Sequence, residues 1–520
     1  MMMIVRAARV AALYWFCSVG AVVAQDVTLI SRDGDVEISG DLLGFDGEFY
    51  RVQTIYGELT VDGSGVRCEG PGCPNLESYV ARVGFSGAPT IGRVLMPALL
   101  EAFALRHQYD LTRETLDDDR FVYILSNPET ATVLGEFTLR LSNTDEGFAD
   151  LLANEADIVM SVREVRQSER QRAREAGLGD LSARGRSRIV ALDALVPVVA
   201  PSNPVQRITT PQLARVLSGD IASWAELGGP DAPITVHVLD GASGIGQATQ
   251  DRLLAPIDKS MSDAAQAHPD GPTLAQAVAG DPFGLGVTSR SELGNTWELA
   301  LEGECGFALR ATRRAVKTED YPLTAPLFLY MPARRFPKLM REFLAYLRDP
   351  SAQLVIRRAG FVDRAPEEIA INAQGDRFAN AIARAGPEID LSELQRMVRI
   401  LAPLRRLTTT FRFEAGSAGL DAQSRSNVQQ LARALELGLY DARRLVFVGF
   451  SDGEGPAGPN KAIAMRRAEA VRRAVTTAAE TANLDRITLE TDAFGEAMPM
   501  ACDDSEWGRQ VNRRVEVWVR

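Results

Sequence analysis

The stretch ITVHVLDGASGIGQATQDRLL, residues 234–254, decides the fold class of the central part of the chain. It opens with alternating apolar and polar residues, which is typical of a strand, and continues through the small-residue loop Gly241–Gly246 into a helical pattern. A loop of this kind directs backbone N–H groups at the helix N-terminus toward an anion. The stretch therefore predicts an α/β fold with an anion site, and leaves the identity of the anion open.

Two kinds of anion fit this loop. It is similar, one residue short, to the glycine loop of short-chain dehydrogenases, in which a dinucleotide pyrophosphate lies on the helix N-terminus. A dinucleotide fold also needs an acidic residue after a second strand, about 20 residues further on. Here that region reads IDKSMSDAAQAHPDGP, residues 257–272, without a strand pattern. We therefore expect no cofactor, and favour a loop that binds a free oxyanion.

The beginning of the chain predicts export. Arg6 and Arg9 precede the apolar run Val10–Ala24, which ends in small residues, as in a cleavable signal peptide. We expect residues 1–24 to be removed and the mature chain to begin at Gln25. No later segment has the ~18 apolar residues of a membrane span, so a soluble periplasmic protein is expected.

Composition excludes some function classes. A net charge of -12 over 520 residues argues against a general nucleic-acid role, because counterion release needs clustered Lys and Arg. Three histidines, at 107, 237 and 268, lack metal-ligand spacing, and Ser243 lacks a Gly-x-Ser-x-Gly frame. We therefore expect neither an enzyme nor a metal site.

Four cysteines follow the predicted signal peptide: Cys68, Cys73, Cys305 and Cys502. An even number in an oxidising compartment permits disulfides. The stretch CEGPGC, residues 68–73, can close a local one, but spacing alone leaves the pairing open.

The pattern along the chain predicts an α/β multidomain protein. Turn signals such as RDGD and VDGSG indicate a small β module over residues 25–76. Alternating strands and helices indicate a larger α/β domain over residues 77–365. Residues 366–407 are expected to form a helical linker, and residues 408–520 a compact C-terminal α/β domain.

The C-terminal domain contains the most specific motif. In VFVGFSDGEGPAGPNKAIAMRRAEAV, residues 446–471, Asp452 follows a strand in a glycine-rich loop and Arg467 lies about two turns into the next helix. An acid and an arginine placed in this way can hold a zwitterion, with the acid on the ammonium and the guanidinium on the carboxylate. The alternative, a turn acid and a solvated arginine, stays open for each residue taken singly.

This motif resembles the OmpA-like peptidoglycan-binding domain. The closing NRRVE, residues 512–516, and the Asp, Asn and Arg-Ala spacing carry the resemblance. It implies an OmpA-like α/β fold in which Asp452 and Arg467 hold the diaminopimelate of the peptide stem, with Ser451 and Asn460 beside them.

The larger domain resembles the periplasmic phosphate-binding proteins of ABC transporters. Several stretches carry the resemblance in order: GAPTIGRVLMPALLEAFA, ADIVMSVREV, ALDALVPVVAPSNPV, ITTPQLARVLSGDIASWAELGGPDAPITV, DGASGIG, FGLGVTS and YPLTAPLFLY. The resemblance implies a periplasmic-binding-protein fold with two lobes joined by crossing strands and a ligand between them.

The resemblance also implies a set of solute-binding residues: Thr90, Ile91, Ser142, Ser161, Ser243 and Gly244. Three positions depart from the family pattern. Ile245 replaces the threonine of Ser-Gly-Thr, Val238-Leu239 replace the usual arginine, and Val162 follows Ser161 in place of a polar residue. Each lost charged donor costs about 1.5–3 kcal/mol of anion binding. Arg163 or Arg93 can compensate if the fold brings them to the cleft.

Together these patterns predict a cell-wall-tethered periplasmic solute-binding protein at the inner face of the outer membrane. The expected partners are peptidoglycan, phosphate or a related oxyanion, and an ABC permease. The alternative is an envelope structural or interaction protein whose solute-binding-like domain is a scaffold or takes a different ligand.

Overall fold

A computed structural model describes residues 26–76, 79–241, 243–303, 308–383, 385–386, 388–413 and 419–520. The predicted signal peptide and Cys305 lie outside the described residues. The chain divides into two compact units: Met1–Ala81 with Phe336–Lys338, and Arg82–Arg335 with Leu339–Arg520. Within the described residues, no helix combines the length and the apolar character that crossing a membrane requires.

The first unit is an antiparallel β module. Its strands lie in the order β4-β3-β2-β1-β5. They are β1 (Asp26–Ser31), β2 (Glu37–Phe45), β3 (Phe49–Thr54), β4 (Gly57–Asp62) and β5 (Val66–Glu69). Alternate residues of β1 and β3 form its core, namely Val27, Leu29, Tyr50 and Val52. A disulfide joins Cys68 to Cys73, as the stretch CEGPGC allows.

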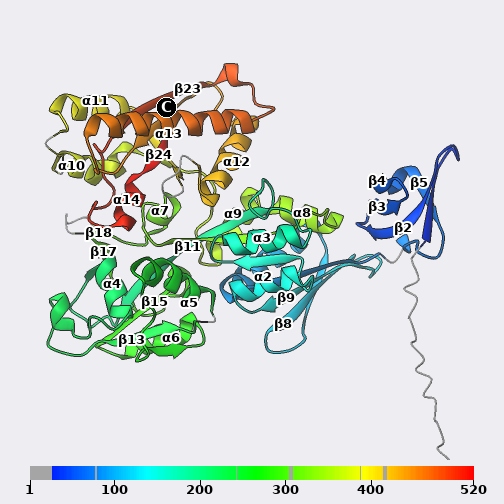
Figure 1. Cartoon of the computed structure of the whole chain (residues 1–520), viewed down its shortest axis with the longest axis horizontal. Coiled ribbons are helices and arrows are strands. Elements are labelled where there is room, and N and C mark those ends of the chain that lie inside the picture. The colour runs from blue at the N-terminus through cyan, green and yellow to red at the C-terminus, as the bar shows by residue number, and fades with distance from the viewer. Residues whose placement is uncertain are drawn as a thin grey trace, which may run out of the picture. The chain divides into compact units, whose positions relative to one another are not determined.

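The second unit begins with a two-lobed α/β domain. Its main sheet runs β14-β13-β15-β11-β19-β10-β6-β9-β8-β7, and β16 also pairs with β11. The long strand β11 (Ser187–Val199) pairs with β19 (Thr324–Tyr330), and these two strands join the lobes. Figure 1 shows β11 running between the lobes coloured cyan and green. This arrangement confirms the predicted two-lobe fold.

The first lobe, called lobe 1, contains the elements before β11 together with two later helices. They are β6 (Ala81–Gly87), η3 (Ile91–Leu95), α1 (Met96–His107), β7 (Asp110–Thr115), β8 (Arg120–Ser126), β9 (Val133–Leu141), α2 (Thr144–Leu152), β10 (Ile158–Ser161), α3 (Gln167–Glu175), α8 (Lys338–Tyr346) and α9 (Pro350–Arg358). Parallel pairing of β6 with β10 matches the α/β pattern of the sequence.

The second lobe, called lobe 2, lies between β11 and β19 in the chain. Its elements are β12 (Arg207–Thr209), α4 (Thr210–Leu217), β13 (Thr235–Leu239), α5 (Gly244–Thr249), η5 (Gln250–Leu254), β14 (Gln266–His268), α6 (Gly271–Gly280), β15 (Gly284–Ser289), β16 (Trp297–Glu298), β17 (Ala300–Glu302) and β18 (Ala308–Leu309). The opening stretch of the sequence forms β13, a loop and α5, as its pattern predicts. The short helix α7 (Arg313–Lys317) leads back to β19.

The C-terminal domain is a mixed sheet with helices on both faces, in the order β20-β21-β24-β22-β23. The strands are β20 (Glu368–Ile369), β21 (Arg405–Arg412), β22 (Arg444–Phe450), β23 (Thr488–Gly495) and β24 (Arg514–Val519). The helices are α10 (Gly375–Ala383), α11 (Leu391–Leu401), α12 (Ala422–Glu436), α13 (Ala457–Ala478) and α14 (Glu506–Asn512).

Alternation along β22 explains the two helical layers. Leu445 and Phe447 share a core with residues of α12 and α13, whereas Val446 and Val448 share one with Leu394 and other residues of α10 and α11. Residues 366–407 were predicted to be a helical linker. The structure instead places them in this domain, because their apolar side chains cover the second face of its sheet.

A cluster of buried charges joins the C-terminal domain to the segment before β19. Arg406 contacts both carboxylate oxygens of Asp320, at 2.6 and 2.9 Å, and its Nε lies 3.3 Å from Glu516. Glu516 also accepts hydrogen bonds from Arg377 and Arg514, at 2.5 and 2.7 Å. Burial acts to raise the pKa of Glu516, but these three guanidinium groups hold it well below its usual range.

Candidate functional site

The predicted oxyanion site lies where lobe 2 meets lobe 1. Helix α5 begins at Gly244, and the Ser243 hydroxyl caps it by accepting a hydrogen bond from the Gly246 N–H at 2.9 Å. On lobe 1, helix α2 begins at Thr144, where the Asn143 side chain accepts from the Glu146 N–H at 2.8 Å. These two helix starts belong to different lobes, and the Gln247 amide links them by donating to Asn143 Oδ1 at 3.2 Å.

The lobes touch through apolar groups at this point. A Cβ added to Gly244 would lie 3.0 Å from Ala88 Cβ and 3.1 Å from Val162 Cγ2. Val162 is 3% exposed and Ile245 is 2% exposed. The contact of Gly244 with Ala88 and Val162 is called the lobe junction below. Val162 and Ile245, which depart from the family pattern, are thus buried at or beside this junction.

The predicted hydroxyl and backbone donors are largely engaged within the chain. Ser161 is fully buried, and its hydroxyl donates to the Arg163 carbonyl at 2.6 Å. The Ser142 hydroxyl lies 3.3 Å from that of Ser86. The Ile91 N–H donates to the Ala88 carbonyl at 3.0 Å. Thr90 is half-buried one residue earlier, at the start of η3.

The two arginines expected to compensate are paired with carboxylates. Arg163 donates to both oxygens of Glu169, at 2.6 and 3.0 Å, and forms a close ion pair with Asp145. Burial acts to lower the pKa of Arg163, but these carboxylates raise it overall. Arg93 lies 3.7 Å from Asp270 of lobe 2. Both guanidinium groups are therefore engaged by carboxylates, although the buried Nε of Arg163 has no hydrogen-bond partner among the described residues.

Glu292 adds a further carboxyl group to this region. Burial raises its pKa to about 7, and the charges of Asp193 and Asp270 act in the same direction. Its carboxyl group lies against the start of α6, where a Cβ on Gly271 would be 2.0 Å from Glu292 Oε2. The region is therefore acidic, which opposes tight binding of an anion.

Two histidines that are distant in the sequence are neighbours in the fold. His237 Nδ1 lies 3.0 Å from His268 Nε2, and His237 Nε2 lies 3.4 Å from Asp281. His237 is 3% exposed, which fits a core histidine with satisfied hydrogen bonds. In the part of the chain that the structure describes, no group of three or more His, Cys, Asp or Glu residues could hold a metal ion.

The second candidate site lies at the end of β22 in the C-terminal domain. Asp452 follows this strand, and its carboxylate accepts a hydrogen bond from Arg513 at 2.8 Å. The loop is held by Asp503, which accepts from the Gly453 N–H at 2.8 Å and from Asn512 at 2.9 Å. Arg513 also pairs with Glu506, at the start of α14.

Arg467 projects from α13 and is half-buried. Its guanidinium carbon lies 5.0 Å from the centre of the Phe413 ring. Burial, followed by the charge of Arg513, lowers its pKa, whereas Asp452 acts to raise it. Among the described residues, no side chain forms a hydrogen bond or a salt bridge with this guanidinium.

The other two predicted residues have different roles. Ser451 is 4% exposed, and its hydroxyl has no hydrogen-bond partner among the described residues. Asn460 donates to Glu496 Oε2 at 3.0 Å and to the Gly455 carbonyl at 3.3 Å. Asn460 therefore positions the loop, whereas Ser451 offers an unused polar atom next to Asp452.

Sequence reasoning missed Arg513, Asp503 and Glu506 as members of this site. Arg513 belongs to the quoted NRRVE, so its position in a family motif was an available signal. Nothing in the local pattern marks Asp503 or Glu506. Their role depends on α14 folding back onto the Asp452 loop.

Two known protein families match parts of this chain. Residues 132–350 match the PBP superfamily domain, and residues 412–513 match the OmpA family. The chain carries a PBP-like domain followed by an OmpA-type domain. These names are used below for the two-lobed domain and the C-terminal domain.

Relatives of the PBP-like domain are distant. The phosphate-binding protein PstS of Borreliella burgdorferi is 22% identical over 258 residues, covering 47% of this chain and 91% of that protein. Protein SphX of Synechococcus elongatus is 28% identical over 237 residues, covering 43% and 68%.

Solved structures resemble each domain separately. An ABC-type phosphate transport receptor from Vibrio cholerae has a TM-score of 0.42 at 20% identity, covering 54% of this chain and 99% of that one. The peptidoglycan-associated lipoprotein of Burkholderia pseudomallei has a TM-score of 0.19 at 26% identity, covering 22% and 90%.

Proposed function

We propose that this chain is a peptidoglycan-anchored solute-binding protein of the periplasm. In this proposal the OmpA-type domain binds the diaminopimelate of the peptide stem. The PBP-like domain captures a small oxyanion, phosphate or a related one, between its lobes. The anchor places the receptor at the cell wall, at the inner face of the outer membrane.

The observation that carries the proposal is the unsatisfied chemistry around Asp452. Arg467 has no described hydrogen-bond partner, and the buried Ser451 hydroxyl has none either. A buried polar group without a partner costs about 1–3 kcal/mol, which applies to the Ser451 hydroxyl, whereas Arg467 is half-buried and its guanidinium is accessible to an external ligand. The predicted acid lies beside them, on the adjoining loop.

Charge complementarity fits a zwitterionic ligand. Arg513 is already paired with Asp452 and Glu506, whereas Arg467 has no carboxylate partner among the described residues, so Arg467 is the guanidinium that an added carboxylate would balance. The ligand's ammonium would take Asp452, and its carboxylate would take Arg467 and the Ser451 hydroxyl. Diaminopimelate carries an ammonium and a carboxylate on one carbon, which suits an acid and a guanidinium that influence each other electrostatically.

A sedimentation assay tests the anchor. Chain purified from the periplasm of an expressing host is mixed with purified diaminopimelate-type peptidoglycan and centrifuged. We expect the wild type to sediment and Asp452→Asn to stay in the supernatant. Equal sedimentation of both chains would contradict the assignment.

The PBP-like domain retains features that favour an oxyanion. The helix starts at Gly244 and Thr144, together with the Thr90 hydroxyl, are drawn from both lobes, and helix N-termini favour negative charge. The printed names of the relatives point to phosphate for those proteins. An ABC permease is the partner that a receptor of this class would serve.

A second candidate function is supported by the lobe junction. The apolar contact of Gly244 with Val162 and the paired Arg163 leave few side-chain donors there. In this case the PBP-like domain would be a scaffold in the envelope, or would take another ligand.

Isothermal titration in oxyanion-free buffer separates the two candidates. Phosphate is titrated first, followed by sulfate and small organophosphates. Micromolar binding of one of them supports capture of an oxyanion. No heat with any of them, from protein that sediments with peptidoglycan, supports the scaffold.

A further inference from the structure

Residues 501–513, called the bridge segment below, contact both the Asp452 site and lobe 2. On one side, the Asp503 carboxylate accepts a hydrogen bond from the Gly453 N–H, and Arg513 donates one to Asp452 at 2.8 Å. On the other side, the Trp507 indole N–H donates to the Arg252 carbonyl of lobe 2 at 2.9 Å. A single short segment of the OmpA-type domain therefore links its ligand residue to the PBP-like domain.

The contact with lobe 2 reaches the helix that starts at the lobe junction. Arg252 lies in η5, which follows α5 directly, and α5 begins at Gly244. The Arg252 guanidinium in turn donates to the carbonyls of Pro322, at 2.9 Å, and Thr324, at the start of β19. Movement at Trp507 thus acts on the helix that meets lobe 1.

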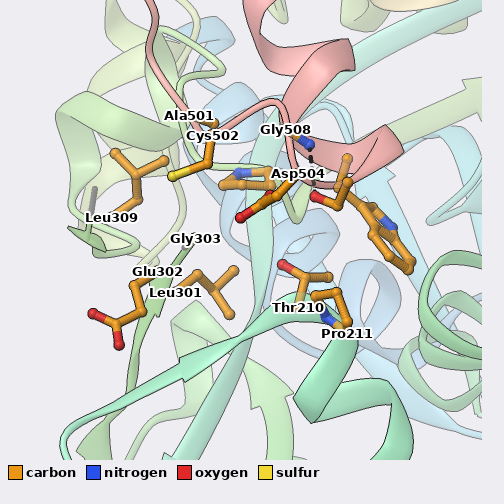
Figure 2. A pocket seen from close by; sticks show the side chains of 13 residues that line it. Thr210, Pro211, Leu301, Glu302, Gly303, Leu309, Ala501, Cys502, Asp504 and Gly508 are labelled. Atoms are coloured by element: carbon orange, nitrogen blue, oxygen red, sulfur yellow. Dashed lines mark hydrogen bonds between the residues drawn. The ribbon is translucent and has the colours of Figure 1, made fainter. Parts of the chain in front are cut away.

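Close packing extends this contact beyond one hydrogen bond. A Cβ on Gly303 of lobe 2 would lie 2.4 Å from Cys502 Sγ, and Cys502 is disulfide-bonded. A crevice continues from there between the domains. Figure 2 shows Ala501, Cys502 and Gly508 on one side of it, and Leu301 and Thr210 on the other.

The rest of the OmpA-type domain contacts lobe 1 and the segments next to β11 and β19. Arg406 binds Asp320 before β19, and Arg364 donates to Asn427 of α12 at 2.8 Å. The Ala422 N–H donates to Glu164 of lobe 1 at 3.2 Å. These contacts are charge-assisted and buried or partly buried, so rotation of lobe 2 about β11 and β19 leaves them in place and displaces the bridge segment.

From this arrangement we infer that the bridge segment couples the Asp452 site to the position of lobe 2. The inference rests on the proposed function of that site. A ligand ammonium that takes Asp452 displaces Arg513, which frees the end of α14 and loosens the Trp507 contact with η5. Wall binding therefore favours separation of the lobes, and by linkage closed lobes weaken wall binding by the same factor.

Amide hydrogen exchange with a defined ligand tests the coupling. The probe is a disaccharide tripeptide that ends in meso-diaminopimelate, added at saturating concentration to the full exported chain. We expect exchange in residues 244–254 to accelerate about fivefold or more, within the range of typical allosteric couplings. Calorimetry on the same sample gives the affinity for the probe.

Two tryptophan variants separate coupling from binding. Trp507→Phe keeps an aromatic ring but removes the indole N–H, so the probe should bind within about twofold of wild type while the exchange response falls by about half or more. Trp297→Phe is the control, because Trp297 is 47% exposed on lobe 2, and it should respond as the wild type does.

The outcomes distinguish the coupling from the anchor. Probe binding without a change of exchange in residues 244–254 of the wild type would overturn the coupling and leave the anchor in place. An undiminished response in Trp507→Phe would also overturn it. Absence of probe binding would contradict the anchor and the coupling together.

Discussion

The lobe junction and the Asp452 site contain similar kinds of polar residue. The two sites differ in how far those residues are already hydrogen-bonded within the chain. At the junction, Ser161 bonds the backbone and Arg163 is paired with Glu169. Only the buried Arg163 Nε and Gln247 Oε1 lack a partner among the described residues there. At the other site, the Ser451 hydroxyl and the Arg467 guanidinium have no hydrogen-bond partner among the described residues. A family motif shows which residue types are present, whereas ligand capacity depends on which of them the fold leaves unengaged.

The largest expected effect is on the affinity for a muropeptide, and it tests whether Arg467 binds the ligand. Arg467→Ala should weaken binding of a diaminopimelate muropeptide about 10- to 100-fold, because one or two charge-assisted hydrogen bonds are lost. Titration calorimetry measures the change. Arg466→Ala is the matched control, since Arg466 is the exposed neighbour on the same helix. If both variants bind alike, Arg467 is not the ligand's partner.

The closed packing of the lobe junction is tested with Gly244→Ala. The added Cβ would lie 3.0 Å from Ala88 and 3.1 Å from Val162, so the lobes must give way by a few tenths of an ångström. We expect a loss of about 1–2 kcal/mol in the stability of the PBP-like domain, with sedimentation on peptidoglycan retained. Thermal unfolding checks the first effect. Unchanged stability would mean that the lobes are not in contact in solution.

Val162→Thr should make the junction more like the family pattern. Thr has nearly the volume of Val and supplies a hydroxyl that can donate to an anion. We expect phosphate affinity to rise about tenfold, and the ligand-free protein to lose about 1 kcal/mol through the buried hydroxyl. Calorimetry in oxyanion-free buffer measures the affinity. A fall in affinity would place the anion away from Val162.

The smallest effect concerns the acidity of the junction region. Because the pKa of Glu292 is about 7, this group is mostly neutral near pH 6 and mostly ionised near pH 8. An ionised Glu292 repels an anion, so sulfate affinity should fall about fivefold between these pH values in the wild type. Sulfate keeps its charge over this range.

Glu292→Gln is neutral at both pH values and should remove this dependence. Its affinity for sulfate should match the wild type near pH 6 and exceed it near pH 8. An equally steep dependence in the variant would assign the titration to another group, such as His268, which lies near Asp270.

Local pattern predicted much of the fold but not the full extent of the C-terminal domain. The strand and helix of residues 234–254 follow from alternation, small residues and helical spacing, all of which are local. The amphipathic sequence pattern of α11 is the same for a helix that leads into a domain and for a helix that covers a sheet. Only its contacts with Val446 and Val448 show that it belongs to the C-terminal core.

The candidate sites also combine residues that a local motif predicts with contacts that only the tertiary structure determines. Asp452 and Arg467 were identifiable because a spaced motif carries them. The pairing of Asp452 with Arg513 was not, since 61 residues separate the two. The contact of Gly244 with Val162 likewise depends on how two lobes close, which no spacing along the chain records.

The most direct test titrates one preparation of the exported chain with two ligands. A diaminopimelate muropeptide and inorganic phosphate are each added by calorimetry in oxyanion-free buffer. The unengaged groups around Asp452 and the engaged groups at the lobe junction predict that the muropeptide binds at least about tenfold more tightly than phosphate. Tight phosphate binding without muropeptide binding would contradict the account.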